Sequence, residues 1–141
     1  MKYLTKNKIE IDAFLQEARH PASGGMVIFS GDTRNHNKGR PVKYLEYESH
    51  ETMAEKMIED ILQHAKEKWN LNYAFCQHRL GRVDIKESAV IVITSSAHRK
   101  QAYESNIYII DEVKSTVPIW KHEFFEDGTV EWGEHQSAEK R

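Results

Sequence analysis

The sequence has little of the residue types that mark several protein classes. Its 141 residues include a single cysteine, Cys76, so the chain can form no internal disulfide and cannot supply the clustered thiolates of a zinc or iron–sulfur site. The longest stretch without Lys, Arg, Asp or Glu, residues 20–31, is far shorter than the roughly 20 apolar residues that a membrane helix needs. The N-terminus also lacks the uninterrupted apolar segment of a signal peptide. We therefore expect a cytoplasmic protein that does not span a membrane.

Net charge and known motifs exclude further classes. The chain has 20 basic and 22 acidic residues, a formal charge of −2, which argues against a general nucleic-acid binder. Its eight histidines form no HxxxH or HExxH pair, and no GxGxxG, Walker or GxSxG motif is present. We therefore expect no metal site and no nucleotide-binding loop. The length predicts one domain over residues 1–141, with a polar tail from about residue 134.

Apolar spacing and turn residues predict a mixed α+β chain. Helical periodicity indicates helices at residues 12–19, 50–69 and from 95 or 96 to about 115, with Asp12, Ser49 and Ser95 or Ser96 as N-caps. The β-like segments are residues 26–30, 42–47, 71–79, 88–94, 119–125 and 129–132, and residues 31–41 form a loop. From residue 42 to 125 the order is strand, helix, strand, strand, helix, strand. That is the split βαβ order of a ferredoxin-like sandwich, here with extra strands on both sides.

The start of the second long helix carries charges of the unexpected sign. A helix N-terminus favours Asp or Glu in its first turn, yet this one has His98, Arg99 and Lys100. One interpretation is that these are three solvent-exposed cations with no further role. The other is that they form an anion site with the free backbone N–H groups, most naturally for phosphate. The loop around Arg34, His36 and other cations is open to the same two interpretations.

Two lysines flank Pro118 where the second long helix gives way to a strand. Lys114 follows Ile110 by four residues and so lies near the apolar face of the helix, and Lys121 shares a strand face with Ile119. A lysine amine in partly apolar surroundings beside another cation becomes available as a base or nucleophile. The alternative is that each amine reaches water while its aliphatic stem packs.

Together these segments are similar to the large, catalytic subunit of molybdopterin synthase. The resemblance covers nearly the whole chain and is carried by GGMVIFSGDTRNHNKG, HRLG, VITSSAHRKQAYE and DEVKSTVPIWKHE. It implies an α/β hammerhead-type fold that contains the ferredoxin-like sandwich. It also implies a homodimer that carries a small ubiquitin-like sulfur-carrier subunit on each side, a heterotetramer in all.

The family resemblance implies a sulfurtransferase of molybdenum cofactor biosynthesis. Members insert two sulfurs into cyclic pyranopterin monophosphate to form the dithiolene of molybdopterin, with no permanently bound cofactor. The sulfur comes from a thiocarboxylate at the C-terminal Gly-Gly of the small subunit, whose tail enters a pocket of the large one. That origin explains how a chain with one poorly placed cysteine can take part in sulfur transfer.

The resemblance also assigns roles to residues. Lys114 matches the principal catalytic lysine, for proton transfer or transient covalent chemistry, and Lys121 matches the second, for charge stabilisation and positioning. Phe29 matches a pocket aromatic. The substrate-binding positions are Asp32, Thr33, Arg34, His98, Arg99, Lys114, Lys121, His122 and Glu123.

One position departs from the family pattern. The family can contribute a basic residue from the C-terminal region of the neighbouring subunit, but no arginine stands at the expected place here, and Lys140 or Arg141 would have to replace it.

A binding module is the rival hypothesis. A ferredoxin-like domain with basic loops could bind RNA through aromatics on a sheet face, for which Tyr44, Tyr47, Tyr73 and Phe75 are available. That hypothesis gives no reason for the two lysines around Pro118.

Overall fold

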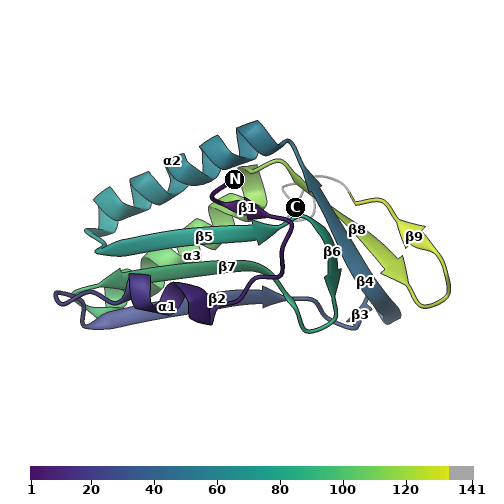
Figure 1. Cartoon of the computed structure of the whole chain (residues 1–141), viewed down its shortest axis with the longest axis horizontal. Helices are drawn as coiled ribbons and strands as arrows, with labels where there is room; N and C mark the ends of the chain where they lie inside the picture. Colours follow the sequence, from purple (N-terminus) through teal and green to yellow (C-terminus); the bar gives the residue numbers. More distant parts are fainter. Residues whose placement is uncertain (134–141) are drawn as a thin grey trace.

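The strands form two sheets that meet at an angle (Figure 1). The computed structural model describes residues 1–133, so the expected polar tail and Lys140 and Arg141 lie outside the described residues. The first sheet has the order β1 (Leu4–Thr5), β5 (Tyr73–Arg79), β7 (Ser88–Ser96), β2 (Gly25–Asp32). The second has the order β3 (His36–Asn37), β4 (Arg40–Ser49), β8 (Ile119–Phe125), β9 (Val130–Glu131), and β6 (Gly81–Asp84) also pairs with β4.

Three helices cover the first sheet. The long helices α2 (Glu51–Trp69) and α3 (Arg99–Thr116) pack on one face, and the short α1 (Asp12–Ala18) packs on the other (Figure 1). The main core lies between the long helices and the sheet, where residues such as Ile58, Ile109 and Val92 are fully buried. No helix in residues 1–133 is both long and apolar enough to cross a membrane.

The helix ends differ in detail from the sequence-based expectation. The N-cap of α2 is His50, whose Nδ1 accepts from the Met53 N–H at 3.3 Å, whereas the Ser49 hydroxyl donates to the Pro118 carbonyl. Asp12 lies inside the first turn of α1, and α3 begins after His98 rather than at Ser95 or Ser96. The predicted caps were therefore wrong, although all three helices and the end of α2 before Asn70 are confirmed.

The mixed α+β class is confirmed, but one strand pairing differs from a ferredoxin-like sandwich. β5 pairs with β7 and β4 pairs with β8, both antiparallel, as the split βαβ order requires. The central parallel pairing of β4 with β7 is absent from the described sheets, so the expected single sheet is divided in two. Because the sheets separate at this point, side chains from both can face the space between them.

Candidate functional site

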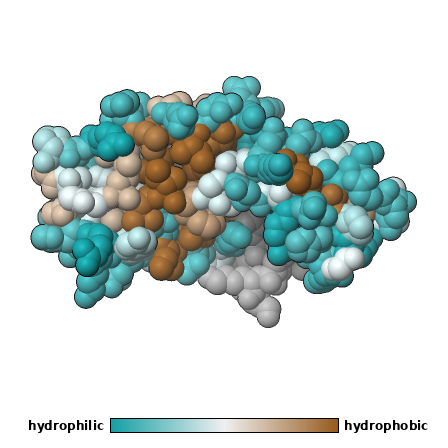
Figure 2. All heavy atoms as spheres, turned by 90° about the horizontal axis from the view of Figure 1, so that it is seen from below, coloured by the Kyte–Doolittle hydropathy of each residue, from teal (hydrophilic) through white to brown (hydrophobic). Residues whose placement is uncertain are grey.

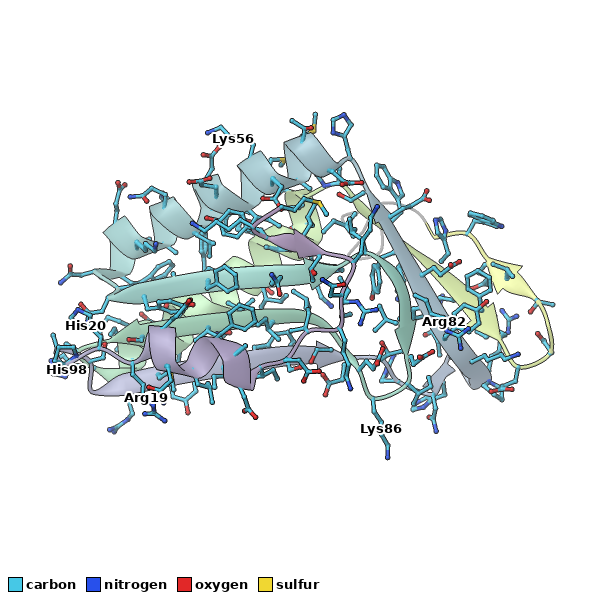
Figure 3. The ribbon with its side chains drawn as sticks, viewed as in Figure 1. Arg19, His20, Lys56, Arg82, Lys86 and His98 are labelled. Atoms are coloured by element: carbon cyan, nitrogen blue, oxygen red, sulfur yellow. The ribbon has the colours of Figure 1, made fainter. Side chains whose placement is uncertain are left out.

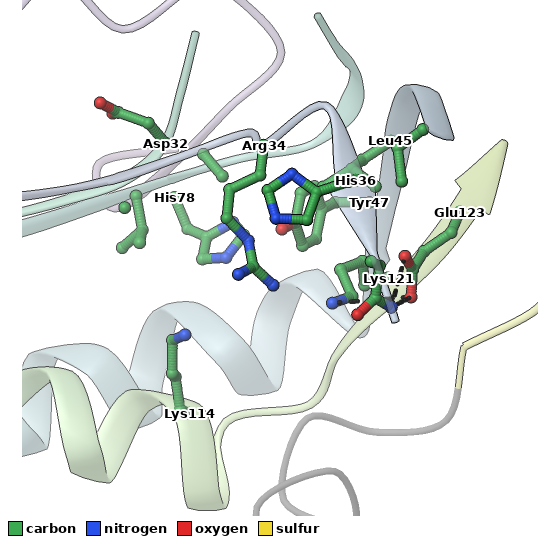
Figure 4. A pocket seen from close by; sticks show the side chains of 14 residues that line it. Asp32, Arg34, His36, Leu45, Tyr47, His78, Lys114, Lys121 and Glu123 are labelled. Carbon is green, nitrogen blue, oxygen red and sulfur yellow. Dashed lines mark hydrogen bonds and ion pairs between the residues drawn. The ribbon is translucent and has the colours of Figure 1, made fainter. Parts of the chain in front are cut away.

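A cavity of about 280 Å³ opens at the junction of the two sheets (Figure 4). Its lining residues come from both sheets and from the C-terminal end of α3. Nine of the lining residues have charged or hydrogen-bonding side chains. They are Asp32, Arg34, His36, Asn37, Tyr47, His78, Lys114, Lys121 and Glu123.

Arg34 is directed into the cavity by a fixed backbone. It follows Thr33, whose N–H donates to the Glu87 carbonyl at 3.1 Å and whose carbonyl accepts from the Lys86 N–H at 3.0 Å. Thr33 itself is 4% exposed and does not line the cavity. Its role in this structure is to anchor the loop from which Arg34 extends.

Lys121 and Glu123 face the cavity from β8. Their side chains share a face because they are two residues apart on a strand. The Lys121 Nζ lies 3.8 Å from Glu123 Oε1, and Asn37 Nδ2 donates to both Glu123 oxygens, at 3.0 and 2.9 Å. Glu123 is thus held from two sides, and the β3 segment is tied to the strand that carries Lys121.

The remaining cations leave the cavity with excess positive charge. Asp32 accepts hydrogen bonds from Ser30 and Ser88, and Glu123 is engaged as described above. Among residues 1–133, neither Arg34 nor Lys114 has a carboxylate within ion-pair distance. Lys114 is exposed in the last turn of α3, so the apolar surroundings expected for it are not found. Two uncompensated cations beside Lys121 suit an anionic ligand.

Sequence reasoning did not single out two residues of this site, Asn37 and His78. Both stand in the segments quoted for the family resemblance, RNHN and HRLG, which is the one signal that pointed to them. His78 is 2% exposed, and burial lowers its pKa to about 4, with the charge of Lys114 contributing.

Two predicted residues lie next to the cavity without lining it. His122 points to the opposite face of β8 from Lys121, where its ring packs 4.4 Å from that of Trp132 and its Nε2 lies 3.3 Å from Glu48 Oε1. Phe29 is 37% exposed on β2, and its ring lies over Gly31, where an added Cβ would be 3.4 Å from Phe29 Cε2. The substrate-binding role of His122 and the assignment of Phe29 as a pocket aromatic stay predictions.

His98 and Arg99 lie far from the cavity. They stand at the N-terminal end of α3, where Figure 3 labels His98, whereas Lys114 is in the last turn. The sixteen residues from His98 to Lys114 span about 24 Å at 1.5 Å per residue. Arg99 packs instead beside Gly25 at the start of β2, where an added Cβ would lie 3.0 Å from Arg99 Cα. Within one chain, the two cationic groups do not meet.

The only cysteine of the sequence is a core residue. Cys76 is fully buried on β5, and burial raises the pKa of its thiol to about 12. The thiol is therefore not available as a sulfur nucleophile.

In residues 1–133 no three His, Cys, Asp or Glu side chains are grouped as a metal site would require.

An apolar surface lies along the free edge of the first sheet (Figure 2). β2 pairs only with β7, so one of its edges has no strand beside it in the described chain. The exposed large apolar residues of β2 and of the neighbouring helix α3 are Ile28, Phe29, Tyr103 and Ile107. An open edge flanked by apolar side chains is a typical protein-contact surface.

The aromatics that an RNA-binding sheet would expose are engaged in packing. Tyr44 stacks on Phe124 at 4.5 Å between ring centroids and also lies under the Arg82 guanidinium. Phe75 packs against Phe14 of α1 at 5.0 Å. The described sheets therefore present no open row of stacking platforms.

Comparisons with known proteins agree with the segments quoted above. Residues 4–116 match the family described as MoaE protein. The molybdopterin synthase catalytic subunit of Thermoplasma volcanium is 40% identical over 129 residues, 92% of this chain and 94% of that protein. That of Bacillus subtilis is 40% identical over 125 residues, 89% of this chain and 80% of that protein.

Solved structures agree as well. The crystal structure of molybdopterin synthase from Staphylococcus aureus superposes with a TM-score of 0.88 at 36% identity, covering 95% of this chain and 97% of the other. A complex of subunits 1 and 2 of the molybdopterin-converting factor from Helicobacter pylori shares the fold, with a TM-score of 0.79 at 21% identity over 96% of this chain and 91% of the other. None of these relatives supports an RNA-binding module. The chain belongs to the MoaE protein family, that of the molybdopterin synthase catalytic subunits.

Proposed function

We propose that the chain transfers sulfur from a partner's thiocarboxylate to cyclic pyranopterin monophosphate, forming the dithiolene of molybdopterin. The observation that carries this proposal is the convergence of Arg34, Lys114 and Lys121, from a loop, a helix and a strand, on one cavity. The substrate is a phosphorylated pterin, and guanidinium and ammonium groups are the usual partners of phosphate. The protein would act in the cytoplasm and keep no permanently bound cofactor.

Each cation has a chemical task in this proposal. Arg34, held by the anchored loop, would bind the substrate phosphate, with Asp32 beside it. Lys114 would move a proton or form a transient covalent bond as the thiocarboxylate attacks. Lys121, oriented by Glu123 and through it by Asn37, would stabilise the negative charge that develops.

The sulfur would arrive on a second protein. Cys76 cannot supply it, because its thiol is buried and stays protonated at physiological pH. The partner we propose is a small ubiquitin-like sulfur carrier whose C-terminal Gly-Gly thiocarboxylate enters the cavity. The Helicobacter pylori assembly, a complex of two subunits, supports the idea of such a partner.

We also propose that two copies of the chain pair along β2, within a heterotetramer. The support is the open edge of this strand and the exposed Ile28, Phe29, Tyr103 and Ile107 around it. In a two-fold symmetric dimer, the two β2 strands would run antiparallel, with each using the same surface. A pair centred between Ile28 and Phe29 would set Gly25 of one copy opposite Asp32 of the other.

This pairing would bring the cationic group at His98 and Arg99 close to a cavity from which it is distant within one chain. Gly25 lies beside Arg99, and Asp32 lines the cavity, so the two ends of β2 correspond to the two cationic groups. Across the proposed dimer, His98 and Arg99 of one copy would reach the cavity of the other. The family's substrate-binding residues would then act together although no single chain brings them together.

The proposal is tested by reconstitution. Purified chain is mixed with thiocarboxylated small subunit and cyclic pyranopterin monophosphate, and the dithiolene product is quantified by chromatography. We expect turnover by the wild type and a loss of at least about 100-fold in Lys114→Ala, since a positioned proton-transfer group contributes that much. The matched control Lys66→Ala removes an exposed lysine from the last turn of α2 and should keep full turnover. Absence of product from the wild type, or near-normal turnover by Lys114→Ala, would contradict the proposal.

A further inference from the structure

Arg79 is a buried cation to which the proposed chemistry gives no task. It ends β5, within the HRLG segment, and is 7% exposed. It does not line the cavity. Burying a charge is costly unless the charge is paired, and an apolar side chain of similar size often leaves a fold as stable or more stable. Core stability alone therefore does not explain an arginine at this position.

The guanidinium of Arg79 makes contacts on both sides of the turn between β6 and β7. Its Nη2 donates to the Arg82 carbonyl in β6. Its Nη1 lies 3.5 Å from Oε1 of Glu87, the residue before β7, and this ion pair is largely shielded from water on the arginine side. Arg79 therefore connects the start and the end of the segment at residues 82–87.

The turn at residues 84–87 has a conformation that needs support. Lys86 has a φ of 76°, in the left-handed region that residues other than glycine seldom adopt. Glu87 closes the turn twice, because its N–H donates to the Asp84 carbonyl and its Oε1 accepts from the Asp84 N–H, both at 3.0 Å. The carboxylate oxygen that faces Arg79 is thus the same oxygen that closes the turn.

This turn also holds the loop that carries Arg34. The Thr33 N–H donates to the Glu87 carbonyl at 3.1 Å, and the Thr33 carbonyl accepts from the Lys86 N–H at 3.0 Å. Thr33 directly precedes Arg34, whose side chain extends into the cavity (Figure 4). The contacts form one continuous series that begins at Arg79 and ends at Arg34.

We propose that Arg79 is a positioning residue that holds Arg34 in the cavity by fixing the turn at residues 84–87. A guanidinium suits this task because its planar fork reaches a carbonyl and a carboxylate at once in a fixed geometry. The inference rests on the proposed function for its catalytic consequence, since Arg34 binds the substrate phosphate in that proposal. The link between Arg79 and the loop can be tested without substrate.

Three variants separate positioning from a general loss of packing. Arg79→Met keeps a long, flexible side chain and removes both contacts of the guanidinium. Arg79→Lys keeps the charge without the fork. Arg82→Met is the matched control, because Arg82 is an exposed arginine of the same hairpin whose ion pair, with Asp84 at 2.7 Å, does not involve Glu87.

The first measurement needs neither substrate nor partner. Hydrogen exchange of the purified chain is followed at the amides of Thr33 and Lys86, with the amide of the fully buried Val92 as the reference. We expect exchange at both amides to be about 10-fold faster in Arg79→Met, the scale of one hydrogen bond to a charged group. Arg79→Lys should show a smaller change and Arg82→Met none. Unchanged exchange at Thr33 in Arg79→Met would overturn the proposal, and so would an equal acceleration at Val92, which would indicate a general loss of stability.

The second measurement is turnover in the reconstituted system. We expect Arg79→Met to raise KM for the pterin by about 10-fold with little change in kcat, because binding of the phosphate by Arg34 is present in the ground state and the transition state alike. Arg34→Ala should have a similar effect, and adding Arg79→Met to it should cause little further loss, since the two residues act in series. Losses that multiply in the double variant would contradict the proposal. A wild type without turnover would contradict the proposed function and leave hydrogen exchange as the test of the link.

Discussion

At the scale of single residues, the burial of His78 has a consequence for stability. In the unfolded chain its imidazole takes up a proton near its ordinary pKa of 6.5, whereas in the folded chain its pKa is about 4. Between these values the unfolded state binds more protons, so the free energy of unfolding falls as the pH is lowered. The contribution is complete above pH 6.5 and is lost as the pH approaches 4.

This linkage predicts a difference between wild type and His78→Gln. From pH 7.5 to pH 5 the titration of His78 should cost the wild type about 2 kcal/mol of unfolding free energy. His78→Gln lacks the titrating group and should lose correspondingly less over the same interval. Urea denaturation of both proteins at the two pH values measures the difference. Equal losses would mean that His78 can take up a proton in the folded chain.

At the scale of elements, one side chain of α2 holds the N-terminal strand. Glu55 accepts hydrogen bonds from the backbone N–H groups of Lys2, Tyr3 and Leu4, at 3.1, 2.9 and 2.7 Å. The carbonyl of Tyr3, the residue before β1, in turn accepts a hydrogen bond from the His78 N–H. The tether therefore supports the strand that carries part of the cavity.

Removal of this tether should loosen β1. We expect Glu55→Ala to lower the free energy of unfolding by about 2 kcal/mol, since bonds to a carboxylate are lost and three backbone donors are left without it. Hydrogen exchange should show faster exchange at Tyr3 and Leu4. The control Glu59→Ala removes an exposed carboxylate one turn further along α2 and should stay within about 0.5 kcal/mol of wild type. Unchanged exchange in Glu55→Ala would show that packing alone holds the strand.

Regular elements were the part of the fold that the sequence predicted best. The apolar spacing of residues 50–69 marks one face of a helix, and the β-branched run at residues 88–94 marks a buried strand, so α2 and β7 are confirmed. β6 was missed because its four residues, GRVD, carry only one apolar side chain. The prediction of a loop over residues 31–41 was wrong in part, because the two-residue strand β3 lies within it and carries no apolar side chain. The division into two sheets depends on strand pairings between distant segments, which no local pattern encodes.

The candidate site was predicted only in part, for a similar reason. Lys114 and Lys121 stand out because they flank Pro118, and both line the cavity. Asn37 looks like an ordinary loop residue in the sequence, and only its bonds to Glu123, 86 residues away, reveal its place. Strand alternation places His122 on the opposite face of β8 from Lys121 and Glu123, so the three residues could not all face one cavity. Which of the two faces lines the cavity depends on how the two sheets pack, and spacing along the chain does not encode that.

At the scale of the whole molecule, the charges are segregated although the net charge is only −2. One cationic group surrounds the cavity at the Asp32 end of β2, and the other lies at the Gly25 end, with apolar residues exposed between them. An eight-residue strand spans about 24 Å, too far for one small substrate to bridge. A second copy that runs antiparallel along β2 is the simplest arrangement that brings the two groups together.

A site that is shared between two copies predicts a different result for mixed dimers than a site formed within one copy. In the proposed dimer each cavity uses Lys114 of one copy and Arg99 of the other. A heterodimer of Lys114→Ala with Arg99→Ala would thus contain one complete site and one site with both defects. A heterodimer of Lys114→Ala with Lys121→Ala is the matched control, because both lysines belong to the cavity of the same copy and neither of its sites would be complete.

The turnover of these heterodimers tests the central claim most directly. The two variants are co-expressed with different affinity tags, purified through both tags, and assayed with thiocarboxylated small subunit and cyclic pyranopterin monophosphate. The account predicts that each variant alone is nearly inactive and that the Lys114→Ala and Arg99→Ala heterodimer forms product at roughly half the wild-type rate, with no recovery in the control. A Lys114→Ala and Arg99→Ala heterodimer as inactive as its parents would contradict the account.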